Sequence, residues 1–385
     1  MKSLAIRDIQ AVEVEGHGFS TYVRVYTNEG LTGTGECIHG GPGAPYIIQR
    51  MKELLIGENP MDVDRLFEKV RRAYLFDGAI AGNIVAALSG IEIALWDLVG
   101  KALELPLYRL LGGKFRDRVR LYADCGDRQL EHCLQNCRDA VALGFNAVKI
   151  DIDNPESPHK LDAWDRSVTA RERQAMVDTV AAVREELGPD IDLAVDMHAR
   201  YNLTAAISIA NALEPFGLLW LEEPIPPENV AAMRELKRST GIPICAGENL
   251  FLRHGFRDLI EQQAVDIIMP DLPKCCGLSE GRKIANLAEV YYVSMAPHNV
   301  CGPLGTMASC HVCASVPNFL VLEWHWLRRD WWDELVLSDI PVISEGYILL
   351  SDAPGIGVEV NPDALKRHLR PGTKYFASAG APYAQ

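Results

Sequence analysis

The stretch Ile191-Asp192-Leu193-Ala194-Val195-Asp196-Met197-His198 shows the unit from which the fold is built. Its apolar run ends in polar residues, and a helix-like run begins near Thr204, which predicts a β-strand that opens into a loop. Side chains alternate along a strand, so Asp196 and His198 point to the same side. A carboxylate and an imidazole two residues apart can therefore share one site.

This unit of strand, polar residue and helix recurs from about residue 117. Helical patterns over Arg171–Leu187, Asn229–Arg238 and Leu278–Val290 lie between candidate strands. Eight strand units indicate the α/β class and a (β/α) barrel over residues 116–330. A doubly wound sheet is the alternative, but no GxGxxG follows the first strand. The candidate strands are Val119–Ala123, Ala147–Ile152, Leu193–Asp196, Leu218–Glu222, Ile242–Ala246, Ile267–Pro270, Val293–Ala296 and Leu320–Glu323.

Residues 1–115 have a different pattern. Runs of β-branched residues at period two predict an antiparallel sheet, and Asn28-Glu29-Gly30 is typical of a hairpin turn. Residues 46–111 then predict helices, most clearly Ala81–Leu103. Strands followed by helices indicate an α+β domain. Its predicted strands are Ala5–Glu15, Thr21–Thr27 and Thr32–Glu36.

The C-terminal segment, residues 331–385, carries short β-like runs at Ile340–Ile343 and Gly346–Leu350, separated by Pro and Gly turns. It is too short to form a domain of its own. We therefore expect it to pack back on the N-terminal domain.

Composition limits the classes of function. The 385 residues carry a formal net charge of −14, which argues against nucleic acid and against anionic membrane surfaces as partners. The ten cysteines lack metal-binding spacing, so we expect reduced thiols in a cytoplasmic protein. The first residues form no apolar leader segment, and no apolar run reaches membrane-spanning length.

Three acids close three successive strands at equal spacing. Asp196, Glu222 and Glu248 are separated by one strand–helix unit each (222 − 196 = 248 − 222 = 26). Active sites of such barrels lie at the C-terminal ends of the strands, so the three carboxylates would meet at the mouth. They would repel one another unless a cation lies between them, and oxygen-only ligation suits Mg²⁺. For any one acid alone, capping of the following helix is an equal alternative.

The remaining strand ends add a histidine, an acid and a lysine. Asp271 and His298 follow successive strands, and a carboxylate that binds an imidazole raises its basicity, as a general base requires. Glu323 could donate a hydrogen bond to a developing enolate oxygen if protonated, and is otherwise a rim acid. Lys149 could bind a substrate carboxylate, and is otherwise a surface lysine at a strand end.

Together these motifs resemble the enolase superfamily, in its mandelate racemase-like subgroup, over nearly the whole chain. The resemblance implies an N-terminal capping domain, a (β/α)7β barrel and a C-terminal segment that returns to the cap. It also implies that Asp196, Glu222 and Glu248 bind Mg²⁺ and that Asp271 and His298 form the base pair. The matching motifs are Val148-Lys149-Ile150-Asp151, Val195-Asp196-Met197-His198, Leu221-Glu222-Glu223-Pro224, Ala246-Gly247-Glu248-Asn249, Met269-Pro270-Asp271 and Ala296-Pro297-His298-Asn299.

Within the subgroup the sequence is most similar to acid-sugar dehydratases of the galactonate type. Dehydration of a 2,3-dihydroxy acid needs one group to take the α-proton and another to protonate the departing hydroxyl. His298 and His198, on different strands, can divide these roles, while the metal would stabilise the enediolate. A supporting role beside the metal is the alternative for His198. Racemases of the subgroup carry a Lys-x-Lys motif on this strand. Lys149 matches the first lysine, but Asp151 stands in place of the second, which disfavours a two-base racemisation.

Residues around the mouth would select the substrate, which we expect to be a small sugar acid. Asp151 could bind a sugar hydroxyl. The loops Gly16–Thr21 and Gly40–Pro45 correspond to the capping loops that choose the substrate in this family. An ordinary exposed loop residue is the alternative for each candidate in these two loops. The candidates are Arg200, Asn202 and Arg253 in barrel loops, and His17, Phe19 and His39 in the capping loops.

Two other functions remain open. The same enolate could serve a racemase, an epimerase or a cycloisomerase, which would exchange the α-proton without loss of water. A non-catalytic relative would bind metal and sugar acid without turnover, although a complete set of acid, base and metal ligands argues against it. The family tends toward homo-oligomers, often octamers, so we also expect a homo-oligomer.

Overall fold

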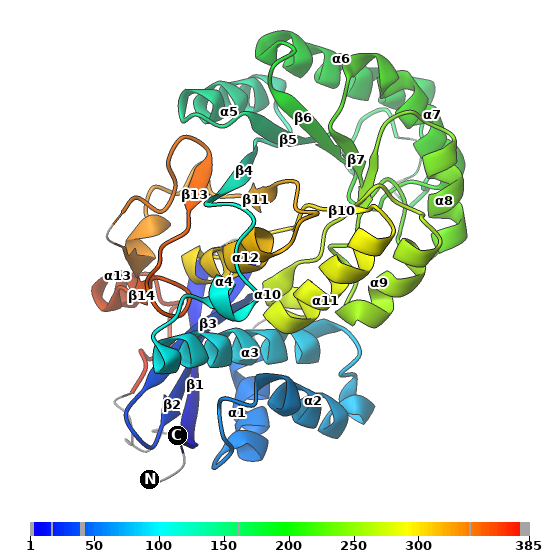
Figure 1. The fold of residues 1–385 in the computed structure, drawn as a ribbon. Helices are drawn as coiled ribbons and strands as arrows, with labels where there is room; N and C mark the ends of the chain where they lie inside the picture. The colour runs from blue at the N-terminus through cyan, green and yellow to red at the C-terminus, as the bar shows by residue number, and fades with distance from the viewer. Residues whose placement is uncertain are drawn as a thin grey trace.

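The computed structural model describes residues 4–16, 18–38, 43–160, 162, 164–338 and 340–377, with only the backbone of Gly18 and Phe19. Figure 1 shows a barrel of strands and helices above an N-terminal sheet and its helices, with the orange and red C-terminal segment beside both. The predicted fold, a barrel with an N-terminal α+β cap, is confirmed.

Eight parallel strands form the barrel, hydrogen-bonded in the order β11-β4-β5-β6-β7-β8-β9-β10. The N–H of Met295 donates to Asn318 O at 2.8 Å, and Leu320 N–H donates to Met295 O at 2.8 Å, which closes the ring between β10 and β11. All eight predicted strands are confirmed within a few residues. They are β4 (Arg118–Asp124), β5 (Ala147–Asp151), β6 (Asp192–Asp196), β7 (Trp220–Glu222), β8 (Ile244–Ala246), β9 (Ile267–Ile268), β10 (Ser294–Met295) and β11 (Leu322–Trp324).

Helices follow the first seven barrel strands and surround them (Figure 1). Local sequence sets where several of them begin. Thr169 Oγ1 accepts a hydrogen bond from Glu172 N at 3.1 Å in a capping box, which fixes the start of α6. The helices are α5 (Leu130–Ala142), α6 (Ala170–Leu187), α7 (Leu203–Leu213), α8 (Val230–Arg238), α9 (Leu252–Glu261), α10 (Leu272–Cys275), α11 (Gly277–Val290) and α12 (Pro303–Ser315).

The cap is an antiparallel sheet covered by helices, in the order β1 (Ile6–Gly16), β2 (Gly18–Thr27) and β3 (Thr32–Ile38). Because β2 begins at Gly18, most of the expected loop Gly16–Thr21 is strand. A Cβ on Gly33 would lie 2.1 Å from Ala94 O, so this glycine allows β3 to approach helix α3 closely. The cap helices are α1 (Ala44–Leu55), α2 (Val63–Ala73), α3 (Gly82–Leu103) and α4 (Leu107–Leu110).

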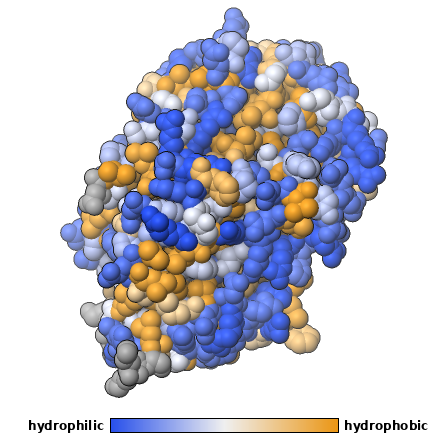
Figure 2. All heavy atoms as spheres, in the orientation of Figure 1, coloured by the Kyte–Doolittle hydropathy of each residue, from blue (hydrophilic) through white to orange (hydrophobic). Residues whose placement is uncertain are grey.

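Helix α3 is the one helix of the described residues that is long and apolar enough to cross a membrane. Its apolar window is 78% buried inside the protein, against the cap sheet, α1 and α10. The apolar side chains of α3 therefore form part of the hydrophobic core. On the face seen in Figure 2 the surface is mainly hydrophilic, with some apolar side chains near the left end of α3.

The C-terminal segment contacts both the barrel and the cap. Strand β13 (Tyr347–Leu349) pairs antiparallel with β4, and β12 (Val336–Leu337) pairs with β14 (Glu359–Val360) ahead of α13 (Pro362–Arg367). Beyond α13, His368 O accepts a hydrogen bond from Glu15 N in the cap at 2.8 Å. The strand predicted at Ile340–Ile343 is wrong, because no strand forms there among the described residues. Pro341 in this run removes a backbone donor.

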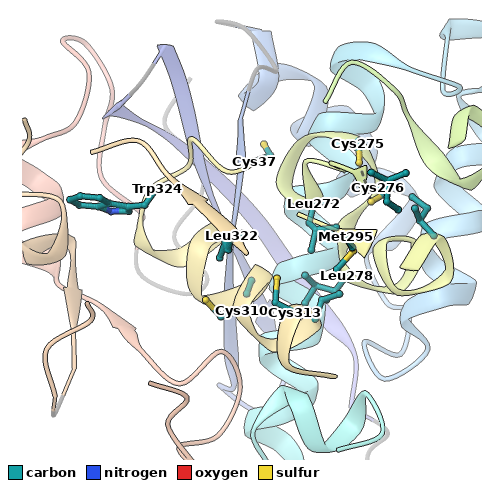
Figure 3. Packing of buried hydrophobic residues seen from close by; sticks show 14 of the residues in the cluster. Cys37, Leu272, Cys275, Cys276, Leu278, Met295, Cys310, Cys313, Leu322 and Trp324 are labelled. Carbon is teal, nitrogen blue, oxygen red and sulfur yellow. Dashed lines mark hydrogen bonds between the residues drawn. The ribbon is translucent and has the colours of Figure 1, made fainter. Parts of the chain in front are cut away.

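Cysteine, leucine and methionine side chains pack in the interior between the cap and the barrel (Figure 3). All ten cysteines are buried and unbridged, as expected for reduced thiols. Trp324 on β11 lies apart from the other labelled side chains, beside the C-terminal segment (Figure 3). It stacks on Phe145 with ring centroids 5.3 Å apart. Odd and even positions of β11 therefore face opposite sides of the barrel wall.

Candidate active site

Three carboxylates meet at the barrel mouth. Asp196 ends β6, Glu222 ends β7 and Glu248 follows β8, and one oxygen of each lies within 4.8 Å of the other two. The register pairs Asp196 with Glu222, and both are buried. Burial, followed by the charge of Asp196, raises the pKa of Glu222 well above its usual value. The three carboxyl groups can therefore all be ionised only with positive charge between them.

Lys149 on β5 lies among these carboxylates and is itself buried. Its Nζ is 2.7 Å from Glu222 Oε1, 2.8 Å from Glu323 Oε1 and 3.3 Å from Asp196 Oδ2. Burial opposes the charge on Lys149, but the carboxylates of Glu222 and Glu323 outweigh it and raise the pKa of the lysine well above its usual value. Lys149 is therefore a cation at the centre of the site.

Glu323 ends β11 as a buried carboxylate. Burial raises its pKa, but the positive charges of Lys149 and His298 outweigh that effect and lower the pKa to about 2. Its Oε2 also accepts a hydrogen bond from Asn299 N at 2.9 Å. The expectation of a protonated Glu323 that donates a hydrogen bond is not supported, because the neighbouring cations favour the charged form.

His298 lies at the mouth after β10, buried beside an acid. Its Nδ1 is 2.6 Å from Asp271 Oδ2, and Asp271 is fully buried. The other ring nitrogen, Nε2, lies 3.5 Å from Glu248 Oε2 and 3.7 Å from Glu323 Oε2. Burial lowers the pKa of His298, but the charges of Glu323 and Glu248 and the hydrogen bond to Asp271 raise it to about 9. The geometry holds Nδ1 on Asp271 and directs Nε2 to the mouth.

His198 forms a second acid–histidine pair, after β6. Its Nδ1 is 2.6 Å from Asp153 Oδ1, and its Nε2 is 3.5 Å from Asp196 Oδ2. Burial lowers the pKa of His198, but the hydrogen bond to Asp153 and the charge of Asp196 raise it to about 10. His198 has a φ of 45° and Ala199 a φ of 55°. Positive φ values at such residues cost roughly 1–3 kcal/mol each and cluster at functional sites.

The two histidines face each other across the barrel. The loops after β6 and β10 carry His198 and His298, and these strands lie four places apart in a ring of eight. They are therefore on opposite sides of the axis. The carboxylate cluster and Lys149 lie between them.

Known proteins show the same arrangement of domains. Residues 132–364 match the family described as enolase C-terminal domain-like. Residues 11–112 match the mandelate racemase / muconate lactonizing enzyme, N-terminal domain. The chain belongs to the enolase superfamily. The resemblance stated from the motifs is confirmed.

Relatives in this superfamily cover nearly the whole chain. D-xylonate dehydratase of Haloferax volcanii is 42% identical over 98% of this chain and 92% of its own length. D-galactonate dehydratase of Xanthomonas oryzae pv. oryzae is 33% identical over 90% of each. The crystal structure of a mandelate racemase/muconate lactonizing enzyme-like protein from Rubrobacter xylanophilus superposes with a TM-score of 0.95. It is 46% identical and covers 98% of this chain and 100% of its own.

In this superfamily member, Asp196, Glu222 and Glu248 form a divalent-metal site. The donor set fits a hard cation, because all three ligands supply carboxylate oxygen. Trp220 Nε1 donates to Glu222 Oε2 at 2.8 Å and so orients one ligand from behind. Asp151, Asp196 and His198 form another close set. We favour the first set, because His198 is already engaged by Asp153.

The substrate-binding candidates divide into those near the mouth and those elsewhere. Asp151 lies near Asp196 and His198, and its Oδ1 is buried with no hydrogen-bond partner among the described residues. Arg200 Nε donates to Asp153, so it supports the His198 pair. Asn202 is better explained as a helix cap, because its Oδ1 accepts a hydrogen bond from Ala205 N in the first turn of α7.

Three more candidates from the capping loops have side chains outside the described residues. They are His17, Phe19 and His39. Arg253 lies in the first turn of α9, and its Nη1 is 2.8 Å from Glu280 Oε1. That ion pair joins α9 to α11 and leaves Arg253 without a visible role at the mouth.

Sequence reasoning missed two acids and a histidine of the site. Asp153 lies two residues beyond Asp151, so the alternation that placed Lys149 and Asp151 inward could have been extended by one step. Asp124 and His325 form a third acid–histidine pair, with His325 Nε2 3.3 Å from Asp124 Oδ2. Asp124 ends the first barrel strand and His325 follows the last, and only closure of the barrel brings them together.

Proposed function

We propose that the protein is a Mg²⁺-dependent acid-sugar dehydratase. It removes the C2 proton of a polyhydroxy acid and expels the C3 hydroxyl to give a 2-keto-3-deoxy acid. The observation that carries this proposal is the placement of two histidines, each held by a carboxylate, on opposite sides of the metal ligands and Lys149. A racemase would use two bases on opposite faces of C2; in this proposal His198 instead acts on the C3 hydroxyl, because Asp153 favours its charged, acidic form.

The substrate carboxylate is held at the centre of the site. Lys149 is a buried cation at the metal ligands and can bind a carboxylate oxygen. Mg²⁺ suits the three carboxylates because it prefers hard oxygen donors and keeps coordination positions open for substrate. When bound, the metal would make the C2 proton more acidic by stabilising negative charge on the substrate carboxylate.

His298 takes the C2 proton at Nε2. Asp271 accepts from Nδ1–H, so the neutral imidazole carries its lone pair on Nε2 at the mouth. Although burial lowers the pKa of His298, the charges of Glu323 and Glu248 help to raise it to about 9, and a cation bound to Glu248 would offset the second of these charges and favour the neutral base. Removal of the proton leaves an enediolate on the substrate. Lys149 remains beside the carboxylate that gains this charge and stabilises it through charge-assisted hydrogen bonding.

His198 protonates the departing C3 hydroxyl from the other side. Asp153 accepts from His198 Nδ1 and keeps the ring charged, so that it can act as an acid. Loss of water leaves an enol, which takes a proton at C3 from solvent to form the keto acid. The two curated relatives, a D-xylonate and a D-galactonate dehydratase, support the same reaction class.

A screen of aldonic and aldaric acids in D₂O with Mg²⁺, followed by proton NMR, tests the proposal. The expected product is a 2-keto-3-deoxy acid with one deuterium at C3. Exchange of the C2 proton with the carbon skeleton intact would instead indicate a racemase, an epimerase or a cycloisomerase. Binding detected by thermal shift without any turnover would indicate a non-catalytic binding protein.

We also propose that the protein is a homo-oligomer. Phe76 and Ile80 support this proposal, since these large apolar side chains between α2 and α3 are 103% and 64% exposed. Static light scattering on the purified protein decides it: a mass of several subunits is expected, and a 42.6 kDa particle would contradict it.

A further inference from the structure

The Asp124–His325 pair is used neither by the metal site nor by the two proton-transfer pairs. Asp124 ends β4 and its side chain is 7% exposed, whereas that of His325 is 26% exposed. Asp124 Oδ1 accepts a hydrogen bond from Gly126 N at 3.0 Å, so the acid is fixed from both sides. The pair therefore presents a firmly held imidazole that solvent can still reach.

Alternation along β11 directs His325 to the mouth. Leu322 and Trp324 (Figure 3) pack into the hydrophobic interior outside the barrel. Trp324 also stacks on Phe145. Glu323 and His325 face the other way, as the contacts of Glu323 with Lys149 and of His325 with Asp124 show. His325 is thus one step further toward the C-terminal end of the barrel than Glu323.

This pair lies across the barrel from the metal. Strand β7 carries the middle ligand, Glu222, and β11 lies four places from β7 in the ring of eight. A sugar acid held by its carboxylate at the metal ligands and Lys149 extends its carbon chain over the mouth. The carbons beyond C3 would lie near the part of the barrel wall that is away from the metal ligands and the two proton-transfer histidines. Among the described residues, this part of the wall carries Asp124, Asp151 and His325.

We infer that His325, Asp124 and Asp151 form a subsite for the distal hydroxyl groups of the substrate, and that the substrate is an aldonic rather than an aldaric acid. This inference rests on the proposed function. One hydroxyl of the chain can donate to Asp151, whose buried Oδ1 has no hydrogen-bond partner among the described residues, and another can accept from the imidazole of His325. A second carboxylate has no proton to donate to Asp151 and would leave its buried Oδ1 without a hydrogen-bond partner.

Binding measurements test the subsite separately from the reaction. Turnover by the unaltered protein comes first, with D-xylonate and the other acids of the screen, since it tests the proposed function without reference to the subsite. Dissociation constants are then measured by calorimetry with Mg²⁺ in a His298→Asn background, which prevents turnover. The ligands are D-xylonate, xylarate with a carboxylate at both ends, and D-glycerate, which has no distal hydroxyls.

The background protein is expected to bind D-xylonate more tightly than xylarate or D-glycerate. Adding His325→Leu should weaken the binding of D-xylonate by about tenfold or more, which is the contribution of a hydrogen bond to a charged group. The preference of the protein for D-xylonate over D-glycerate should fall by the same factor. Asp124→Asn, which keeps the shape of the side chain, should act in the same direction. His254→Leu on the exposed face of α9 is the matched control and should change nothing.

Three results would overturn the inference. Tighter binding of xylarate than of D-xylonate would exclude the aldonic preference. Equal weakening of D-xylonate and D-glycerate by His325→Leu would place His325 at the reaction centre instead. Unchanged affinities in both His325→Leu and Asp124→Asn, with folded protein by thermal melting, would remove the subsite. If the unaltered protein dehydrates none of the screened acids, the proposed function is refuted, while these affinities still decide the subsite.

Discussion

His198 Nδ1 lies 2.6 Å from Asp153 Oδ1, at the opposite side of the barrel from the matching contact between His298 and Asp271. Each carboxylate binds the nitrogen that faces away from the mouth, so each imidazole presents Nε2 to the substrate space. Two proton-transfer groups are thereby built on one scaffold. Their different neighbours assign them different tasks.

Replacement of His298 by asparagine removes the proposed base. We expect the rate of C2 proton exchange and of dehydration to fall by at least about a hundredfold, since a positioned base contributes that much or more. Proton NMR in D₂O measures both rates. Metal binding, followed by the thermal shift with Mg²⁺, should persist in this variant. Exchange at the original rate would show that another group takes the proton.

Asp153→Asn removes the charge that keeps His198 protonated. The dehydration rate should fall by about tenfold or more, while C2 exchange falls less, because only protonation of the leaving hydroxyl is affected. The comparison is the ratio of the two rates in one NMR time course. Gln174→Asn, on the exposed side of α6, is a suitable control substitution. Equal loss of both rates would assign Asp153 a structural role.

Glu222→Gln tests the metal site. The substitution keeps the size of the side chain but removes one of three anionic ligands and leaves Lys149 with one fewer partner. The rise in melting temperature that Mg²⁺ produces in the original protein should disappear. A full metal-induced shift in the variant would mean that the cation binds elsewhere, for example at Asp151 and His198.

Glu36 links the cap to the barrel and makes stability depend on pH. Its carboxylate accepts hydrogen bonds from Gly302 N and Gly305 N at the start of α12, and burial raises its pKa to about 7. The folded state therefore binds a proton more tightly than the unfolded state. The free energy of unfolding should fall as pH rises from about 4.5 to about 7, by up to about 3 kcal/mol.

Urea unfolding at several pH values measures this dependence. Glu36→Gln should flatten the curve in that window, because the neutral side chain no longer titrates. Glu29→Gln, in the exposed hairpin turn of the cap, is the control and should leave the curve unchanged. An identical slope in Glu36→Gln and in the original protein would show that other groups cause the effect.

The sequence predicted the barrel and the metal ligands for one physical reason. Parallel strands of a barrel share one active face, so the acids at their C-terminal ends could be placed together from spacing alone. The geometry of Asp196, Glu222 and Glu248 agrees with that spacing. Buried strands also produce apolar runs that are easy to recognise, which explains why all eight were found.

The parts that escaped prediction depend on contacts between distant segments. The Asp124–His325 pair joins residues about 200 positions apart, and their contact exists only because β11 pairs with β4. Glu323 is charged because Lys149 from another strand lies 2.8 Å away. The side chain of Asn202 looked like a substrate ligand, but it caps the helix that follows it.

The division of labour between the two histidines is tested most directly in a His198→Asn variant. The sugar acid dehydrated by the original protein is incubated with this variant and Mg²⁺ in D₂O, and proton NMR follows the C2 hydrogen and the product. We predict that deuterium replaces the C2 hydrogen while the carbon chain keeps its C3 hydroxyl. Formation of the 2-keto-3-deoxy acid at the original rate would contradict the account.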